Sequence, residues 1–378
     1  MKVKIFILIV VAALPICLSA QKEKLPIIKA NSVVVDIKED KVLRKGVWQI
    51  TPEEKLDVYT TSAQKVTFYT DLDSISFNIN PKVGKYDFII LLNGKDTART
   101  QIKYEPTRLE ILKGAVKYNY SDNRFIPEFT YQSEDNPNLK TIRQELQLDS
   151  IAGKGNELSQ IFNLFHWVHN LIRHDGNSSN PTLKNAIDLI RVCKTENRGV
   201  NCRMLATILN ECYLSMGIKS RFITCMPKES QFDDCHVINM VYSKDLNKWI
   251  WIDPTFDAYV MDERGDLLGI QEVRERLIKG QPLVLNADAN WNREKLQTKE
   301  DYLNHYMAKN LYRLECPVSS EYNTETWEKG KEVAYVELLP LDGIEQTPQK
   351  EEITNQEMEV KFVNYKTNNP NLFWGKPK

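Results

Sequence analysis

The sequence has almost no net charge and few histidines. Its 378 residues include 50 basic and 51 acidic side chains, five histidines and seven cysteines. Neither sign of charge is concentrated in a block or stripe, so we do not expect nucleic acid as a partner. No internal repeat is present either. The chemistry of this protein must therefore rest on a small number of groups whose positions can be followed one by one.

Long apolar runs are missing after the first twenty residues. Lys2 and Lys4 precede a short apolar run, and Leu18-Ser19-Ala20 offers a small-residue cleavage site. This order is typical of an export signal, and the run is too short for a comfortable membrane span. We expect a signal peptide at 1–20, no transmembrane span after its removal, and a mature protein in the periplasm, at the cell surface or outside the cell.

The segment 21–134 lacks histidine and cysteine, so it offers little chemistry. It contains short runs with alternating or β-branched residues, and Asn93-Gly94 is a strong hairpin-turn signal. The predicted strands lie at 32–37, 65–70, 74–79 and 86–92. We predict an all-β, sandwich-like domain here that serves as a spacer or packing module. A polar stretch with several glycines, 135–155, predicts a linker.

An α+β domain is predicted from 156 to the C-terminus. Asn156 is a plausible helix N-cap, and apolar residues follow it at helical spacing as far as Ile172. Further helices are predicted at 182–193, 270–279 and 300–314, and further strands at 218–226, 332–339 and 358–365. Because charge does not separate the last third of the chain from the rest, we treat it as an extension of the same domain.

The stretch 198–254 contains the most specific signal in the sequence. Cys202 follows a glycine turn and opens a run of helical periodicity that ends before Gly217. At a helix N-terminus the dipole and the unpaired N–H groups favour a thiolate over a thiol. Cys202 is therefore the candidate nucleophile.

A predicted β-hairpin follows this helix and supplies two partners. His236 begins its first strand and Asp253 ends its second, so the antiparallel pairing makes them neighbours. A cysteine at a helix start, a histidine and an aspartate are the parts of an activated thiol nucleophile. Cys235 is a poor alternative to Cys202, because successive strand residues point to opposite faces.

These segments resemble the transglutaminase-like superfamily, whose core is papain-like. The resemblance rests on Gly199-Val200-Asn201-Cys202, on Cys235-His236-Val237-Ile238-Asn239, and on Trp251-Ile252-Asp253-Pro254-Thr255, and it covers about 156–259. It implies that Cys202 is the nucleophile, that His236 is the base and later the acid, and that Asp253 orients the imidazole.

The resemblance also implies an oxyanion hole with the backbone N–H of Cys202 as one donor. The second donor stays open, with Asn197 and Asn201 as the candidates. The expected reaction is acyl transfer from an amide through a thioester on Cys202. Because water is abundant outside the cell, we favour a cysteine peptidase or amidase acting on a peptide, glycopeptide or cell-wall peptide. The alternatives are a protein-crosslinking transglutaminase and a non-catalytic binding or scaffold protein.

No cofactor or metal is expected. His166 and His169 lie one helical turn apart and could share a face, but no third zinc ligand occurs at a recognisable spacing. We interpret them as helix-packing histidines, and His174 and His305 as isolated. The acidic loop 262–266 is too short and too basic for a calcium-binding EF-hand.

The cysteines other than Cys202 allow two interpretations. An exported protein can form disulfides, and Cys225 and Cys235 flank one loop, so they are the first choice for a bridge. Alternatively they are small buried hydrophobic residues, as free cysteines commonly are. Cys17 lies within a loose match to a bacterial lipoprotein signal, which makes it a candidate lipidation site.

Overall fold

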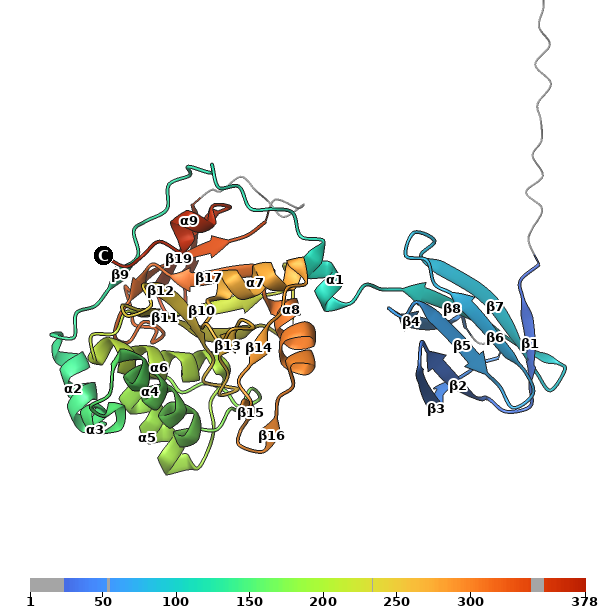
Figure 1. The fold of residues 1–378 in the computed structure, drawn as a ribbon, viewed down its shortest axis with the longest axis horizontal. Coiled ribbons are helices and arrows are strands. Elements are labelled where there is room, and N and C mark those ends of the chain that lie inside the picture. Colours follow the sequence, from blue (N-terminus) through green and yellow to red (C-terminus); the bar gives the residue numbers. More distant parts are fainter. Residues whose placement is uncertain (1–23, 53–54, 233, 341–349) are drawn as a thin grey trace, which may run out of the picture. The chain divides into compact units, whose positions relative to one another are not determined.

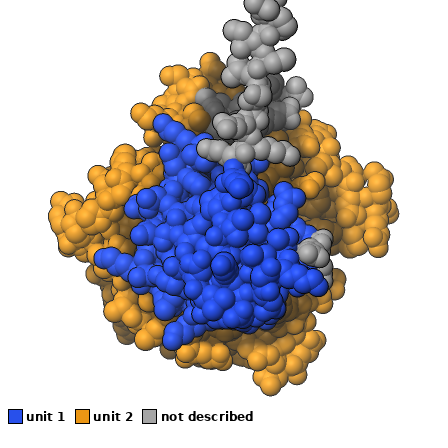
Figure 2. All heavy atoms as spheres, turned by 90° about the vertical axis from the view of Figure 1, so that its right-hand side faces the viewer, with its two compact units in different colours: residues 1–106 blue, residues 107–378 orange. Residues whose placement is uncertain are grey.

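The computed structural model describes residues 24–52, 55–232, 234–340 and 350–378. The predicted export signal and Cys17 lie outside these described residues. The chain divides into two compact units, 1–106 and 107–378, which are coloured separately in Figure 2. No helix in the described part of the chain is long and apolar enough to cross a membrane.

Unit 1 consists of two four-stranded sheets that share one apolar core. The first sheet has the order β1 (Ile27–Ala30), β7 (Lys85–Leu92), β8 (Asp96–Tyr104) and β4 (Asp57–Thr61). The second has the order β3 (Val42–Gln49), β2 (Val34–Glu39), β5 (Lys65–Tyr69) and β6 (Ser74–Asn78). Phe68 from one sheet meets Phe88 from the other, with ring centroids 5.0 Å apart. The β-rich character predicted for this segment is confirmed.

The boundary between the units differs from the predicted one. The predicted β-domain ends at 134, whereas the compact unit ends at 106 and α1 (Arg108–Lys113) already belongs to unit 2. The predicted linker contains two helices, α2 (Pro137–Glu145) and α3 (Leu148–Ala152). Leu139 and Ile142 of α2 and Leu148 and Ala152 of α3 are fully buried, with α2 packed on α6 and α3 packed on α4. Tertiary packing therefore holds a segment whose composition is typical of a loop.

Unit 2 is built on a seven-stranded sheet (Figure 1). Its order is β12 (Lys248–Ile252), β11 (His236–Ser243), β10 (Ser220–Met226), β17 (Arg313–Pro317), β19 (Glu332–Leu338), β21 (Val360–Thr367) and β20 (Glu351–Asn355). The strands after residue 312 thus continue the sheet that the predicted hairpin begins. The other described strands of this unit are two residues long and form separate pairs: β9 (Thr130–Tyr131) with β18 (Ser319–Ser320), β13 (Val260–Met261) with β14 (Val284–Leu285), and β15 (Asn290–Trp291) with β16 (Lys295–Leu296).

Alternate residues of the strands serve two different cores. Trp249 and Trp251 of β12 pack into the cluster that contains α1, α7 and η1, whereas Ile250 and Ile252 pack into the cluster formed with α2 to α6. This is the period of two that a strand buried on both faces must show. Helices therefore cover both faces of the sheet, as Figure 1 shows for α6 and α7.

Predicted helices are found as α4 (Glu157–Leu171), α6 (Cys202–Ser215) and α7 (Ile270–Lys279), and the one predicted at 182–193 is found slightly later as α5 (Ala186–Glu196). The short α9 (Pro370–Phe373) was not predicted. Asn156 caps α4 by accepting a hydrogen bond from the Ser159 amide, as predicted. The segment predicted as one helix at 300–314 is a π-helix, η1 (Glu300–Met307), followed by the short α8 (Ala308–Asn310). From Arg313 the chain forms β17 and pairs with β10. The helical segment therefore ends before the predicted residue 314.

Candidate active site

Cys202 is the first residue of α6, and the chain reaches it through a tight approach of two segments. Val200 accepts from the amide of Asp175 (2.8 Å) and donates to the carbonyl oxygen of Arg173 (3.3 Å). A Cβ on Gly199 would lie 2.5 Å from that carbonyl oxygen, so only glycine allows the approach. Asn201 then caps the helix by accepting from the Met204 amide at 3.1 Å. The helix start and the thiol are thereby fixed relative to the chain around 173–175.

His236 and Asp253 lie side by side at the ends of two paired strands. Nε2 of His236 is 2.7 Å from Oδ2 of Asp253, and both side chains are essentially buried. The register of β11 against β12 pairs Asn239 with Ile252, which brings the start of one strand to the end of the other. The His236 imidazole also hydrogen-bonds the thiol of Cys202. Since Nε2 is occupied by Asp253, Nδ1 is the nitrogen left to face the sulfur. The three predicted residues are thus brought together in one line of contacts.

Asp253 is held by four hydrogen bonds. Its Oδ1 accepts from the amides of Thr255 (2.9 Å) and Phe256 (3.4 Å), and its Oδ2 accepts from the hydroxyl of Tyr302 (2.6 Å) as well as from His236. The indole N–H of Trp251 in turn donates to the Tyr302 hydroxyl at 3.1 Å. Trp251 thus lies in the strand core and is joined to Asp253 through Tyr302. The sequence carries no signal for Tyr302, because no spacing rule connects η1 to the end of β12.

Aromatic rings cover His236. The ring centroids of Tyr306 and Phe256 lie 5.3 and 5.5 Å from that of the imidazole, both nearly edge-on. His236 and Asp253 are 1% and 0% exposed, whereas Cys202 is half-buried. Cys202 is therefore the member of the three that is partly open to solvent, and its two partners lie in a dry environment that strengthens their interactions.

The electrostatics of the site favour a thiolate and an imidazolium. Burial by itself raises the pKa of Cys202, but hydrogen bonds from His174 and His236, the positive charge of His236 and the Val237 amide together lower it to about 6. Burial lowers the pKa of His236, yet the carboxylate of Asp253 and the neighbouring Cys202 raise it to about 10. Between these two values the pair exists as thiolate and imidazolium, the form in which a cysteine attacks a carbonyl.

The other described cysteines are inert by comparison. Burial raises the pKa of Cys235 to about 11 and that of Cys316 to about 12, and it also raises the pKa of Cys193, Cys212 and Cys225. All six described cysteines are unpaired, so the suggested bridge between Cys225 and Cys235 is wrong. Cys225 pairs across the strands with His236, which places Cys235 one residue out of register and on the opposite face. The interpretation as buried small hydrophobic residues fits Cys225.

His174 is a further neighbour of the Cys202 thiol, although its place in the sequence predicts an isolated histidine. It hydrogen-bonds the side chain of Cys202 and forms an isolated parallel bridge with Val200. Its Nδ1 accepts from the indole N–H of Trp291 at 3.3 Å. The sequence carries no signal for this contact, because His174 comes after a helix end and Trp291 lies in a two-residue strand more than a hundred residues away.

The remaining histidines of α4 serve packing and do not share a site. Nδ1 of His166 pairs with Oδ1 of Asp257 at 2.7 Å. His169 contacts the carbonyl oxygen of Pro254 (3.0 Å) and Oδ1 of Asn290 (3.1 Å). Within the described ranges no group of three or more histidine, cysteine, aspartate or glutamate side chains is placed to hold a metal ion.

A hollow of about 410 Å³ lies beside the start of α6. Arg203, the residue after Cys202, lines it and binds Glu325 at 3.2 Å. Lys184 lies over the ring of Trp327, 4.9 Å from its centroid. Glu315 also lines the hollow, and burial raises its pKa to about 7 although the positive charge of Arg203 acts to lower it. The hollow thus offers an aromatic surface and both signs of charge near the first turn of α6.

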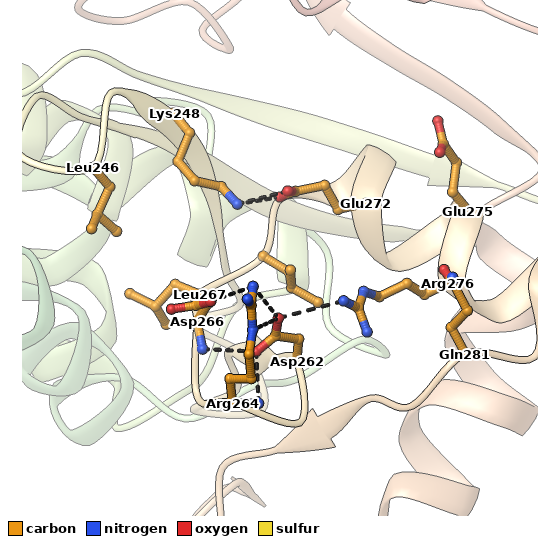
Figure 3. A pocket seen from close by; sticks show the side chains of 11 residues that line it. Leu246, Lys248, Asp262, Arg264, Asp266, Leu267, Glu272, Glu275, Arg276 and Gln281 are labelled. Atoms are coloured by element: carbon orange, nitrogen blue, oxygen red, sulfur yellow. Dashed lines mark hydrogen bonds and ion pairs between the residues drawn. The ribbon is translucent and has the colours of Figure 1, made fainter.

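A second hollow of about 410 Å³ contains charges that already pair with one another (Figure 3). Arg264 and Arg276 converge on Asp262 at 3.3 and 3.4 Å, and Lys248 pairs with Glu272. The aspartates of the acidic loop 262–266 therefore form ion pairs with Arg264 and Arg276.

Comparison with known proteins identifies the central part of unit 2. Residues 144–254 match the family model of the transglutaminase-like superfamily. No curated protein sequence matches the chain. Among solved structures, the chain is similar to a candidate cysteine protease from Cytophaga hutchinsonii, with 16% identity, a TM-score of 0.26, and coverage of 72% of this chain and 91% of that one.

Two transglutaminases are also similar. A protein described as a TGase shows 17% identity and a TM-score of 0.24, with 46% of each chain covered. The transglutaminase of red sea bream shows 14% identity and a TM-score of 0.23, with 62% of this chain and 50% of that one covered. The chain therefore spans about half the length of these two proteins.

Proposed function

We propose that this protein is an exported thiol enzyme that cleaves peptide or amide bonds and that its chemistry lies in the region of the transglutaminase-like match, 144–254. The observation that carries the proposal is the position of His236, which contacts both the thiol of Cys202 and the carboxylate of Asp253. A nucleophile, a base and a group that orients the base are the minimum set for acyl transfer.

The reaction begins with attack of the Cys202 sulfur on the carbonyl carbon of the substrate. A C–S bond forms, and the carbonyl oxygen takes up negative charge. When the intermediate collapses, the C–N bond breaks and the His236 imidazolium gives its proton to the leaving amine. The acyl group remains on Cys202 as a thioester. His236, now neutral, removes a proton from water, which attacks the thioester and releases a carboxylic acid and the free thiolate–imidazolium pair.

Hydrolysis is the proposed fate of the thioester. Transfer to an amine instead of water would make the protein a crosslinking transglutaminase, and the same three residues would serve. The hollow beside Arg203 supports a peptide substrate, since its aromatic and charged walls could bind side chains flanking the scissile bond. We place the side chains of a peptide, glycopeptide or cell-wall peptide there.

The test compares two products from one substrate. Purified protein is incubated with casein and a fluorescent primary amine, and new α-amino groups and bound fluorescence are both measured. We expect new amino groups, little bound fluorescence, and loss of both signals in Cys202→Ala. Fluorescence without new amino groups would replace the proposal with the crosslinking reaction.

A reactivity measurement decides between an enzyme and a scaffold. Iodoacetamide at pH 7 should label Cys202 faster than a free thiol, and His236→Ala should remove the advantage because the thiol loses its positive neighbour. Cys193→Ala is the matched control, since burial raises the pKa of that thiol. If Cys202 labels no faster than free cysteine, the activated nucleophile is disproved and the scaffold interpretation remains.

A further inference from the structure

The proposed reaction needs a second hydrogen-bond donor for the developing oxyanion. The first turn of α6 supplies backbone N–H groups that have no partner within the helix, including that of Cys202. The two asparagines suggested by the sequence both lie at helix ends. Oδ1 of Asn201 accepts from the Met204 amide, and Asn197 ends α5 with left-handed backbone while its carbonyl oxygen accepts from Arg173.

His174 is held rigidly beside the thiol. Asn292 binds its backbone from both sides, since Oδ1 accepts from the His174 amide at 2.6 Å and Nδ2 donates to its carbonyl oxygen at 3.0 Å. The parallel bridge to Val200 fixes the same residue against the turn that leads into α6. The side chain therefore extends from a backbone that is tied to the helix start and reaches the Cys202 sulfur.

The contact with Trp291 decides which ring nitrogen of His174 carries the proton. An indole N–H can only donate, so Nδ1 of His174, 3.3 Å away, must accept. The proton of the neutral ring then sits on Nε2. A ring in this tautomer is neutral and presents an N–H donor to the reaction centre. The proton that is transferred in the reaction is carried by His236 alone.

We propose that the Nε2–H of His174 is the second oxyanion donor, a role that rests on the proposed acyl-transfer function. In the tetrahedral intermediate the oxyanion is two bonds from the sulfur, so a donor that reaches the sulfur before attack lies within reach of the oxygen after it. No proton leaves His174 in this step. Charge builds on the carbonyl oxygen, is stabilised by two N–H groups, and returns to the carbonyl when the C–N bond breaks.

The experiment compares two reactions of the same thiol in the full-length protein. Alkylation by iodoacetamide passes through no oxyanion, whereas acetylation by p-nitrophenyl acetate does. Both first-order rates at Cys202 are measured at pH 8, where the thiol is ionised, by intact mass and by the burst of p-nitrophenolate. We expect His174→Ala to slow acetylation about a hundredfold and alkylation less than about threefold, because the two other thiolate donors, His236 and the Val237 amide, remain.

Two further variants test whether His174 donates a hydrogen bond to the oxyanion or only supports the local structure. His174→Gln keeps an N–H donor at a similar reach and should recover acetylation to within about tenfold of the wild type. Trp291→Phe removes the donor that fixes the tautomer and should slow acetylation several-fold without slowing alkylation. His305→Ala, an exposed histidine of η1, is the control and should change neither rate. Thermal melts exclude any variant that does not fold.

The result that overturns the inference is an equal loss in both reactions, or no loss in either, in His174→Ala. A different result would contradict the proposed function. In that case the wild-type protein is acetylated no faster than N-acetylcysteine, or it releases no p-nitrophenolate beyond the first equivalent. The first pattern removes His174 from the oxyanion hole and leaves the enzyme intact. The second removes the enzyme and the inference with it.

Discussion

The hydroxyl of Tyr302 donates to Oδ2 of Asp253 at 2.6 Å, the same oxygen that accepts from His236 at 2.7 Å. Two donors converge on one carboxylate oxygen, and two backbone amides hold the other. The carboxylate therefore cannot rotate away from the imidazole without losing several bonds at once. Tyr302, itself anchored by Trp251, is a positioning residue for the proposed active site.

Removing the Tyr302 hydroxyl should cost both stability and activity. Tyr302→Phe leaves the Trp251 indole N–H buried without an acceptor, which costs about 1–3 kcal/mol in the free energy of unfolding. With one of its donors gone, Asp253 is less firmly held, and kcat should fall about tenfold with little change in KM. Urea denaturation and steady-state kinetics measure the two effects. Tyr312→Phe is the matched control, because that buried hydroxyl has no partner among the described residues and its loss should be neutral.

Asp253→Asn should lower kcat a hundredfold or more. The asparagine oxygen can replace only one carboxylate oxygen, so its NH₂ group must face either the two amides or the His236 and Tyr302 donors. The imidazolium also loses the carboxylate that raises its pKa. The midpoint of the alkaline limb in the pH–rate profile should therefore move to lower pH. A profile unchanged from that of the wild type would mean that Asp253 does not act on His236.

The pH dependence of hydrolysis should differ from that of alkylation. Hydrolysis needs the thiolate and the imidazolium, so kcat/KM should rise through about pH 6 and fall through about pH 10. Alkylation needs the thiolate alone and should show the rise without the fall. Measuring both reactions across the pH range with one protein preparation tests the assignment. A falling alkaline limb in alkylation would show that another group controls the thiol.

Glu211 should make the domain less stable as the pH rises. It is buried on α6 and accepts from the amides of Ala186 (2.7 Å) and Asn323 (2.8 Å), yet burial raises its pKa from 4.5 to about 8. Because the folded state binds this proton more tightly than the unfolded state, its contribution is full below about pH 4.5 and is lost as the pH rises through about 8. The loss should amount to a few kcal/mol.

The measurement is the free energy of unfolding of wild type and Glu211→Gln between pH 5 and 9. The glutamine does not titrate, so the difference between the two proteins should shift in favour of the variant as the pH rises. Glu196→Gln, at the exposed end of α5, is the control and should leave the slope of the wild type unchanged. Parallel curves for wild type and Glu211→Gln would show that Glu211 is ionised in the folded protein at all these pH values.

Local patterns were sufficient for the elements that carry Cys202, His236 and Asp253. The helix of Cys202 shows an apolar period of three to four residues, and the strands of His236 and Asp253 are short β-branched and aromatic runs around a polar turn. Their antiparallel pairing follows from the short connection, which is why His236 and Asp253 could be predicted as neighbours. The order of the seven-stranded sheet could not be predicted in this way, because its remaining strands lie far along the chain.

The sequence by itself determined the candidate nucleophile, its two expected partners and the helix start that favours a thiolate, since each depends on residues close together in the chain or joined by one hairpin. Only the tertiary structure decided what surrounds them. His174 reaches Cys202 because Asn292 and Val200 hold its backbone there, and Tyr302 reaches Asp253 because η1 packs against the same face of the sheet as Trp251. Such contacts join segments that no periodicity links, and they exist only once both faces of the sheet are covered.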